Sequence, residues 1–75
     1  MTSYKVHALW DADAAVWTVT QSDVPGLATE APTVEALAAK LRIMIPALLE
    51  LNGLPLSEEP VVDLHTASRV LIAAH

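Results

Sequence analysis

The chain is poor in several residue types, and each absence narrows what it can be. It has 75 residues, with no cysteine, two glycines and four basic residues against nine acidic ones, for a net charge of −5. Without cysteine, disulfide bonds and thiolate metal sites are excluded. Without clustered Lys and Arg, direct binding to a nucleic-acid backbone is disfavoured. The acidic balance suits a basic protein partner, or simply a well-solvated surface.

The sequence also lacks a long apolar run. No stretch reaches the roughly 18 uninterrupted apolar residues of a membrane span. The first residues, Met1 to Lys5, lead directly into an alternating segment, so no signal peptide is expected. We therefore expect a cytoplasmic protein with no membrane partner.

What is present is a small and very apolar domain. Hydrophobic residues make up 53% of the chain, which predicts a folded protein, and residues 1–75 have room for a single domain. Below roughly 80 residues, apolar burial and chain entropy nearly cancel, so a scaffold of this size usually needs disulfides, a metal or a partner subunit. Because the chain has no cysteine, disulfides and thiolate metal sites are excluded here, and self-association is the remaining support. We therefore expect a homo-oligomer, either a dimer or a tetramer.

The first third of the chain has the patterns of β-structure. Tyr4 to Trp10 alternates between two sides with a period of two, and Ala15 to Thr20 is rich in Val, Thr and Trp. Asp11 to Ala14 between them predicts a tight turn, because Asp accepts hydrogen bonds from nearby backbone N–H groups. Ser22 to Gly26 breaks the pattern, and Leu27 to Thr29 can then form only a short third strand.

A helix is predicted from Val34 to Leu51. Thr33 is the expected N-cap, Glu35 complements the first turn, and Asn52-Gly53 gives the C-terminal signal. Pro46 requires either a bend or a second short helix; we favour one bent helix because the apolar stripe continues in phase. That stripe consists of positions 34, 37, 38, 41, 44, 45, 48 and 51.

The last predicted element is a strand from Val61 to Ile72, with a bulge or break near His65 to Ser68. The chain therefore reads as α+β, a β-β-β-α-β sandwich of two layers. Because crossover connections are right-handed, the last strand should lie beside the first and parallel to it.

Three segments in a fixed order carry a resemblance to a known family. They are the strand Ala15 to Thr20, the loop Ser22-Asp23-Val24-Pro25-Gly26-Leu27, and Thr29-Glu30-Ala31-Pro32-Thr33-Val34-Glu35-Ala36-Leu37. Together they resemble the HicB-like antitoxin family, which carries a D-x-P-G loop before a T-x-E-x-x-T-x-E-E-like helix start. The resemblance extends over residues 4 to 53, and Ile45 to Gly53 is similar to the helix end in short, single-domain relatives.

The resemblance implies a partial ribonuclease H-like sheet that binds and masks a small basic ribonuclease toxin of the HicA type. Such an antitoxin acts by occlusion and needs complementary surface, not a catalytic group. Longer relatives carry a C-terminal DNA-binding segment; here Arg69 is the only basic residue after Arg42, so operator binding is not expected. The alternative is a self-assembling structural or regulatory interaction module that has no toxin.

Candidate contact residues follow from these patterns. Asp23, Pro25 and Gly26 are turn residues that would also form the rim of a partner-binding surface. Trp10 and Trp17 are on the two arms of the hairpin, where they would pack across strands or anchor an interface. Ile43, Ala47 and Leu54 lie off the apolar stripe or beyond the helix, and we expect them at an oligomer contact.

No catalytic, metal or cofactor site is expected. His7, His65 and His75 have no metal-ligand spacing, and the apolar helix stripe is core rather than a cofactor site. A metal-dependent nuclease would need several converging carboxylates, the first of them within the first strand. Asp11 and Asp13 come too late, in the turn, and have no evident third ligand. An enzyme is the least favoured of the three hypotheses.

Overall fold

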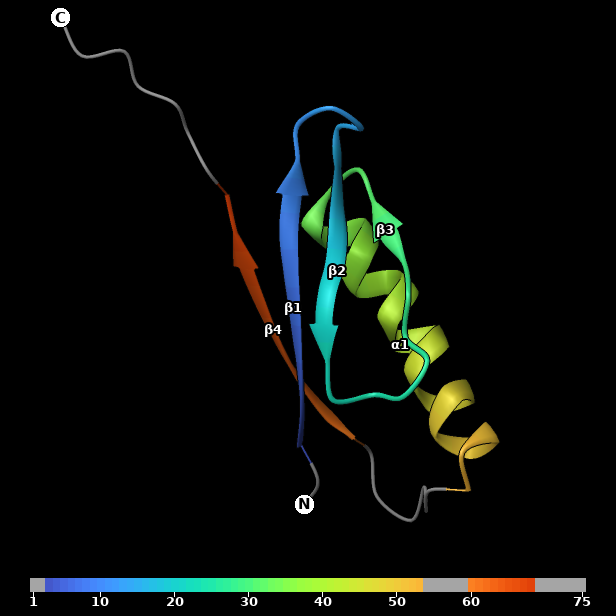
Figure 1. The fold of residues 1–75 in the computed structure, drawn as a ribbon. Coiled ribbons are helices and arrows are strands. Elements are labelled where there is room, and N and C mark those ends of the chain that lie inside the picture. The colour runs from blue at the N-terminus through green and yellow to red at the C-terminus, as the bar shows by residue number, and fades with distance from the viewer. Residues whose placement is uncertain (1–2, 54–59, 69–75) are drawn as a thin grey trace, which may run out of the picture.

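The computed structural model describes residues 3–53 and 60–68. Its elements follow the predicted order: β1 (Ser3–Asp11), β2 (Val16–Ser22), β3 (Glu30–Ala31), α1 (Val34–Leu51) and β4 (Val61–Ala67). The four strands form one mixed sheet, and α1 lies along one of its faces (Figure 1). The α+β class and the β-β-β-α-β order are thus confirmed.

The order of strands in the sheet is β3-β2-β1-β4. β1 is antiparallel to β2 and parallel to β4, so the predicted position of the last strand beside the first is confirmed. An irregularity of the bulge type is present between His7 and Ala8, where the β1–β2 register shifts by one residue. The sequence predicts a bulge or a break near His65 to Ser68. β4 pairs in unbroken register, so there is no bulge, and the strand ends at Ala67, within the predicted interval. Positions 69–72 of the predicted strand lie outside the described residues.

The ends of α1 are those that the sequence predicts. The Thr33 hydroxyl accepts a hydrogen bond from the Ala36 N–H at 3.0 Å, and the Asn52 N–H donates to the Leu48 carbonyl at 3.0 Å. Gly53 follows with a φ of +70°, which glycine adopts without strain. The helix continues through Pro46 without interruption, so a second helix beginning there is excluded.

The predicted buried stripe is wrong at its C-terminal end. The buried residues of α1 are Leu37, Leu41, Ile45 and Leu49, whereas Leu51 is 82% exposed. Positions along an α-helix differ by about 100° per residue, so Leu51 lies about 200° around the axis from Leu49. The four buried residues are spaced four apart and all face the sheet, whereas Leu51 faces solvent.

The boundaries of β2 and β3 also differ from the prediction. Ala15 has a φ of +56° and belongs to the turn, and β2 continues to Ser22. The third strand is Glu30–Ala31 instead of Leu27 to Thr29. The reason is that the chain before it crosses the end of the core as a loop, in which Val24 is only 2% exposed.

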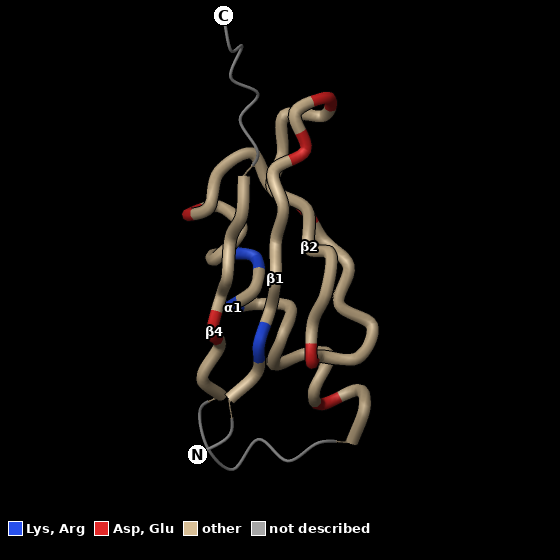
Figure 2. The backbone as a smooth tube through the Cα atoms, turned by 60° about the vertical axis from the view of Figure 1, so that its left-hand side comes forward, with Lys and Arg blue, Asp and Glu red and all other residues tan. Residues whose placement is uncertain are grey.

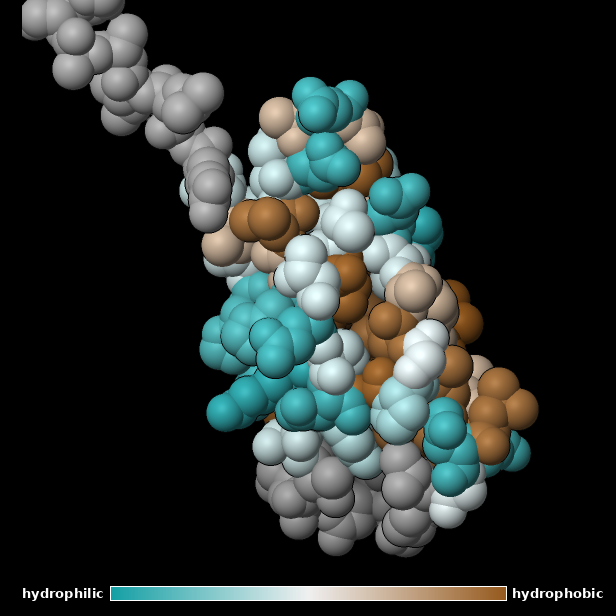
Figure 3. Space-filling model, in the orientation of Figure 1, coloured by the Kyte–Doolittle hydropathy of each residue, from teal (hydrophilic) through white to brown (hydrophobic). Residues whose placement is uncertain are grey.

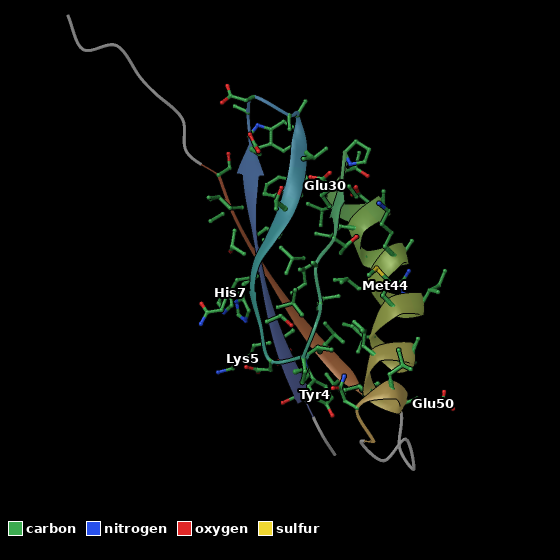
Figure 4. The ribbon with its side chains drawn as sticks, turned by 45° about the vertical axis from the view of Figure 1, so that its right-hand side comes forward. Tyr4, Lys5, His7, Glu30, Met44 and Glu50 are labelled. Carbon is green, nitrogen blue, oxygen red and sulfur yellow. The ribbon has the colours of Figure 1, made fainter. Side chains whose placement is uncertain are left out.

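The core lies between α1 and the sheet. Val6 and Ala8 of β1 and Ala31 of β3 are buried on the sheet side of this core, and the four buried side chains of α1 named above are on its helix side. The opposite sheet face carries Lys5, His7 and Leu9 of β1, which alternate with the buried residues. Helix α1 covers the first face and leaves the second open, and Figure 4 shows Lys5 and His7 pointing away from α1.

Candidate interaction surfaces

The two tryptophans lie opposite each other at the hairpin end of the molecule. Trp10 of β1 pairs with Trp17 of β2, and their ring centroids are 5.4 Å apart at an interplanar angle of 57°. Both rings are half-buried, and they line a shallow hollow of about 400 Å³ together with Pro32, Val34 and Glu35 at the start of α1. The expected cross-strand contact is present, and it leaves part of each ring exposed.

This hairpin end is acidic. Asp11 is the last residue of β1 and Asp13 lies in the turn that follows, and Figure 2 shows acidic positions at this end of the hairpin. The Asp11 carboxylate accepts hydrogen bonds from the N–H groups of Asp13 and Ala14 at 3.1 and 3.2 Å, as the sequence predicts for this turn. Among the described residues, the basic side chains are Lys5, Lys40 and Arg42, and none of them lines the hollow.

The Asp23-Pro25-Gly26 loop lies at the other end of the sheet. β2 ends there at Ser22, whereas the tryptophans lie at the end where β2 begins (Figure 1). Gly26 has a φ of +80°, and the Pro25 carbonyl accepts a hydrogen bond from the Asn52 side chain at 3.5 Å. The five residues predicted to bind a partner therefore form two separate groups and not one surface.

The predicted oligomer contact falls on the outward face of α1. Ile43 is 76% exposed and Ala47 is also exposed. Leu51, which we expected in the core, joins the same exposed side of the molecule. Leu54 lies outside the described residues.

Sequence reasoning missed the pair of histidines on the open sheet face. His7 of β1 and His65 of β4 are opposite each other in the parallel register, and their rings stack with centroids 4.9 Å apart and an interplanar angle of 16°. Hydrophilic residues gather over β1 and β4 on this face (Figure 3). The alternation of β1 puts His7 on this face, but nothing in the sequence sets the register of β4, so the contact could not be found from the pattern.

A groove runs between α1 and β4. It has a volume of about 580 Å³ and is lined from β4 by Val62 and Leu64 and from α1 by Leu41, Arg42 and Pro46. Val62 and Leu64 are half-buried, so the groove is open beside the last strand of the sheet. Its lining is mainly apolar.

Comparison with known proteins defines the family of the chain. The model of a domain of unknown function, DUF1902, matches residues 3–73. The chain belongs to the DUF1902 family. A solved relative of this DUF1902 chain is the hypothetical protein TTHA1013 from the extremely thermophilic bacterium Thermus thermophilus, with 47% sequence identity and a TM-score of 0.79. The match covers 93% of this chain and 99% of that one. No curated protein matches the sequence.

Two further findings bear on what the DUF1902 domain can bind. Within residues 3–53 and 60–68, no group of three or more His, Asp or Glu side chains is placed to hold a metal ion. The part of the chain that the structure describes has no helix with the length and apolar character of a membrane span. The described residues present three surfaces: the acidic aromatic end, formed by Trp10, Trp17, Glu35, Asp11 and Asp13, the open sheet face with His7 and His65, and the groove beside β4.

Proposed function

We propose that this DUF1902 chain is a HicB-like antitoxin-type protein that binds and occludes a small basic ribonuclease toxin of the HicA type in the cytoplasm. The ordered match of the hairpin, the D-x-P-G loop and the helix start supports the proposal. The observed sheet, a three-stranded meander with a parallel fourth strand, is compatible with the partial ribonuclease H-like fold that this resemblance implies.

The observation that carries the proposal is the acidic aromatic end. Trp10 and Trp17 line the same hollow as Glu35, at the end of the sheet where β1 ends at Asp11 and the turn carries Asp13. A Lys or Arg side chain stacked on a tryptophan face gains about 0.5–2 kcal/mol, and nearby carboxylates speed its approach and fix its orientation. This end of the molecule therefore suits a partner that presents basic side chains.

Occlusion needs no chemistry from the antitoxin. The basic residues with which a ribonuclease holds RNA phosphates are the groups that an acidic surface attracts, so the same contact would block the toxin's substrate. The protein itself is expected to have no catalytic activity, and we place no cofactor in it. Asp23, Pro25 and Gly26 lie too far from the tryptophans to share one small contact, and we assign them to the loop structure first.

The test is co-expression with a HicA-type small basic protein, taken from an adjacent gene where the genome encodes one there. Wild-type antitoxin should co-purify with it and relieve its toxicity. Asp13→Lys and Trp10→Ala should weaken both effects by roughly ten-fold or more, since an interface anchor contributes about 2 kcal/mol. Glu50→Lys, a charge reversal at the opposite end of α1, is the matched control and should bind normally. A complex that tolerates Asp13→Lys and Trp10→Ala but not Glu50→Lys would place the toxin elsewhere.

A second function is favoured by the open helix face. Ile43 is 76% and Leu51 is 82% exposed, and apolar exposure of this kind supports a self-assembling structural or regulatory module without a toxin. Light scattering with and without the adjacent gene product separates the two. A self-associated protein whose mass is unchanged by the added product favours the module, and a mixed complex favours the antitoxin.

The enzyme hypothesis has its own test. The Asp11 carboxylate bonds to two backbone N–H groups of its own turn, which suits a structural role. Metal-stimulated RNA cleavage that disappears in Asp11→Ala or Asp13→Ala would overturn the expectation that the protein is not an enzyme.

A further inference from the structure

Within residues 3–53 and 60–68, β4 is an edge strand of the sheet. Among the described residues it pairs only with β1, and its seven residues, Val61–Ala67, contain no Pro, Lys or Arg and no bulge. Natural proteins usually guard such edges with those devices, because an open strand offers unpaired N–H and C=O groups to another chain. The opposite edge is different: β3 has two residues, and Lys40 of α1 donates to the Glu30 carbonyl at 2.6 Å. An added strand would therefore join at β4.

The sequence of β4 is complementary to itself in one register. In an antiparallel pair about a two-fold axis, residues that face each other must lie on the same side of the sheet. An axis at Leu64 places Asp63 opposite His65 of a second copy, twice in the dimer. An axis at Asp63 would instead place two carboxylates opposite each other, which is destabilising. An axis at His65 would leave Asp63 opposite Ala67.

In this register, acidic and basic or His side chains alternate across the interface on the sheet face that points away from α1. Lys5 is opposite Asp63 within one chain, and His65 is opposite His7. With the axis at Leu64, one continuous row reads Lys5, Asp63, then His65 and His7 of the second copy. Each carboxylate has a basic or titratable side chain on both sides, so the row favours association even though the whole chain is acidic.

The inner face supports the same register. Val62 and Leu64 are half-buried above the groove between β4 and α1. A two-fold axis perpendicular to the sheet keeps both helices on one side, so Leu64 meets Leu64 of the second copy over the open side of both grooves. This contact buries apolar surface that a single chain leaves partly exposed.

We propose that two copies of this chain associate through antiparallel β4–β4 pairing centred on Leu64, which joins their two four-stranded sheets into one. The interface differs from the helix contact expected from the sequence at Ile43 and Ala47. It does not depend on the toxin proposal, because the acidic aromatic end stays exposed at both ends of the joined sheet.

Engineered cysteines test the register directly, since the natural chain has none. Facing residues of an antiparallel pair have Cα atoms about 4.5–5.5 Å apart, within disulfide range. Mixing Asp63→Cys with His65→Cys under mild oxidation should give cross-linked mixed dimers. Either variant alone should cross-link far less, because identical residues are then two positions apart along the strands, about 8 Å. Ile43→Cys is the control for the helix face and should not cross-link to itself.

A charge series gives a second, non-covalent readout. His65→Asp opposes Asp63 of the second copy twice and should raise the dimer dissociation constant by roughly ten-fold or more. His65→Lys should leave it unchanged or lower. His65→Asp should stay folded by circular dichroism, because its neighbour within the chain is His7. A wild-type monomer by light scattering at micromolar concentration, or self-cross-linking of Ile43→Cys without the mixed 63–65 product, would overturn the proposal.

Discussion

Asp23 is tied to Lys5 by two hydrogen bonds at the end of the β1–β2 pair. The Asp23 N–H donates to the Lys5 carbonyl at 3.0 Å, and the Lys5 N–H donates to the Asp23 carboxylate at 2.9 Å. The Asp23 carboxylate thus takes the place of a backbone carbonyl and adds one more step to the hydrogen-bond ladder between β1 and β2. Val24, the next residue, is buried at the end of the core. A residue singled out as a partner contact therefore has a structural role that accounts for its presence.

This role predicts how substitutions at Asp23 behave. Asp23→Ala removes the acceptor and should lower the free energy of unfolding by about 1 kcal/mol, the usual net value of such a bond. Asp23→Asn keeps an acceptor oxygen and should cost less than half as much. Urea denaturation of the two variants measures the difference. If Asp23→Ala leaves the unfolding midpoint unchanged, the bond to Lys5 contributes nothing and the partner role regains priority.

Local signals explain why much of this fold could be predicted. The period of two in β1, the turn chemistry of Asp11 and the cap at Thr33 each depend on a few neighbouring residues. The position of β4 followed from connection rules, which depend only on element order. The helix also continues through Pro46, because the apolar positions on both sides of it face the same core.

Features set by tertiary packing could not be predicted in the same way. Leu49 and Leu51 are equally apolar, and only the direction in which α1 meets the sheet makes one buried and the other exposed. The stack of His7 on His65 depends on the register of two strands far apart in the sequence. The separation of the tryptophans from the Asp23 loop depends on β2 running the length of the sheet.

The two described glycines offer a matched pair of substitutions. Gly26 and Gly53 have φ values of +80° and +70°, and a Cβ at Gly26 would lie 3.7 Å from the Leu48 Cδ2, an ordinary contact, whereas Gly53 has open space. The backbone alone should decide the effect, so Gly26→Ala and Gly53→Ala should each cost about 1 kcal/mol. Thermal unfolding of both variants gives the comparison. A much larger loss for Gly26→Ala would mean that the loop and α1 pack more tightly than the distance indicates.

The N-cap of α1 should contribute measurably to stability. Thr33→Ala leaves the Ala36 N–H without its acceptor and should cost about 1 kcal/mol, within the range found for such caps. Thr33→Ser retains the hydroxyl and should be close to wild type, which separates the cap from any loss of the Thr33 methyl group. Guanidinium denaturation followed by helix circular dichroism is the measurement. Equal losses for Ala and Ser would contradict a capping role.

Leu37 and Leu51 test the corrected helix orientation with one substitution at two positions. Leu37 is fully buried against the sheet and Leu51 is 82% exposed, although both are leucines of α1. Leu37→Ala should cost about 2–5 kcal/mol, since it removes buried methyl groups and leaves a cavity. Leu51→Ala should change the free energy of unfolding by less than about 0.5 kcal/mol. Because a small domain has only about 5–15 kcal/mol in total, the first variant should be partly unfolded under conditions where the second is native. If Leu51→Ala lowered the free energy of unfolding as much as Leu37→Ala in dilute protein, Leu51 would have to be buried in the folded chain. If Leu51→Ala were destabilising only at high protein concentration, the exposed helix face would be an interface between copies, in competition with β4.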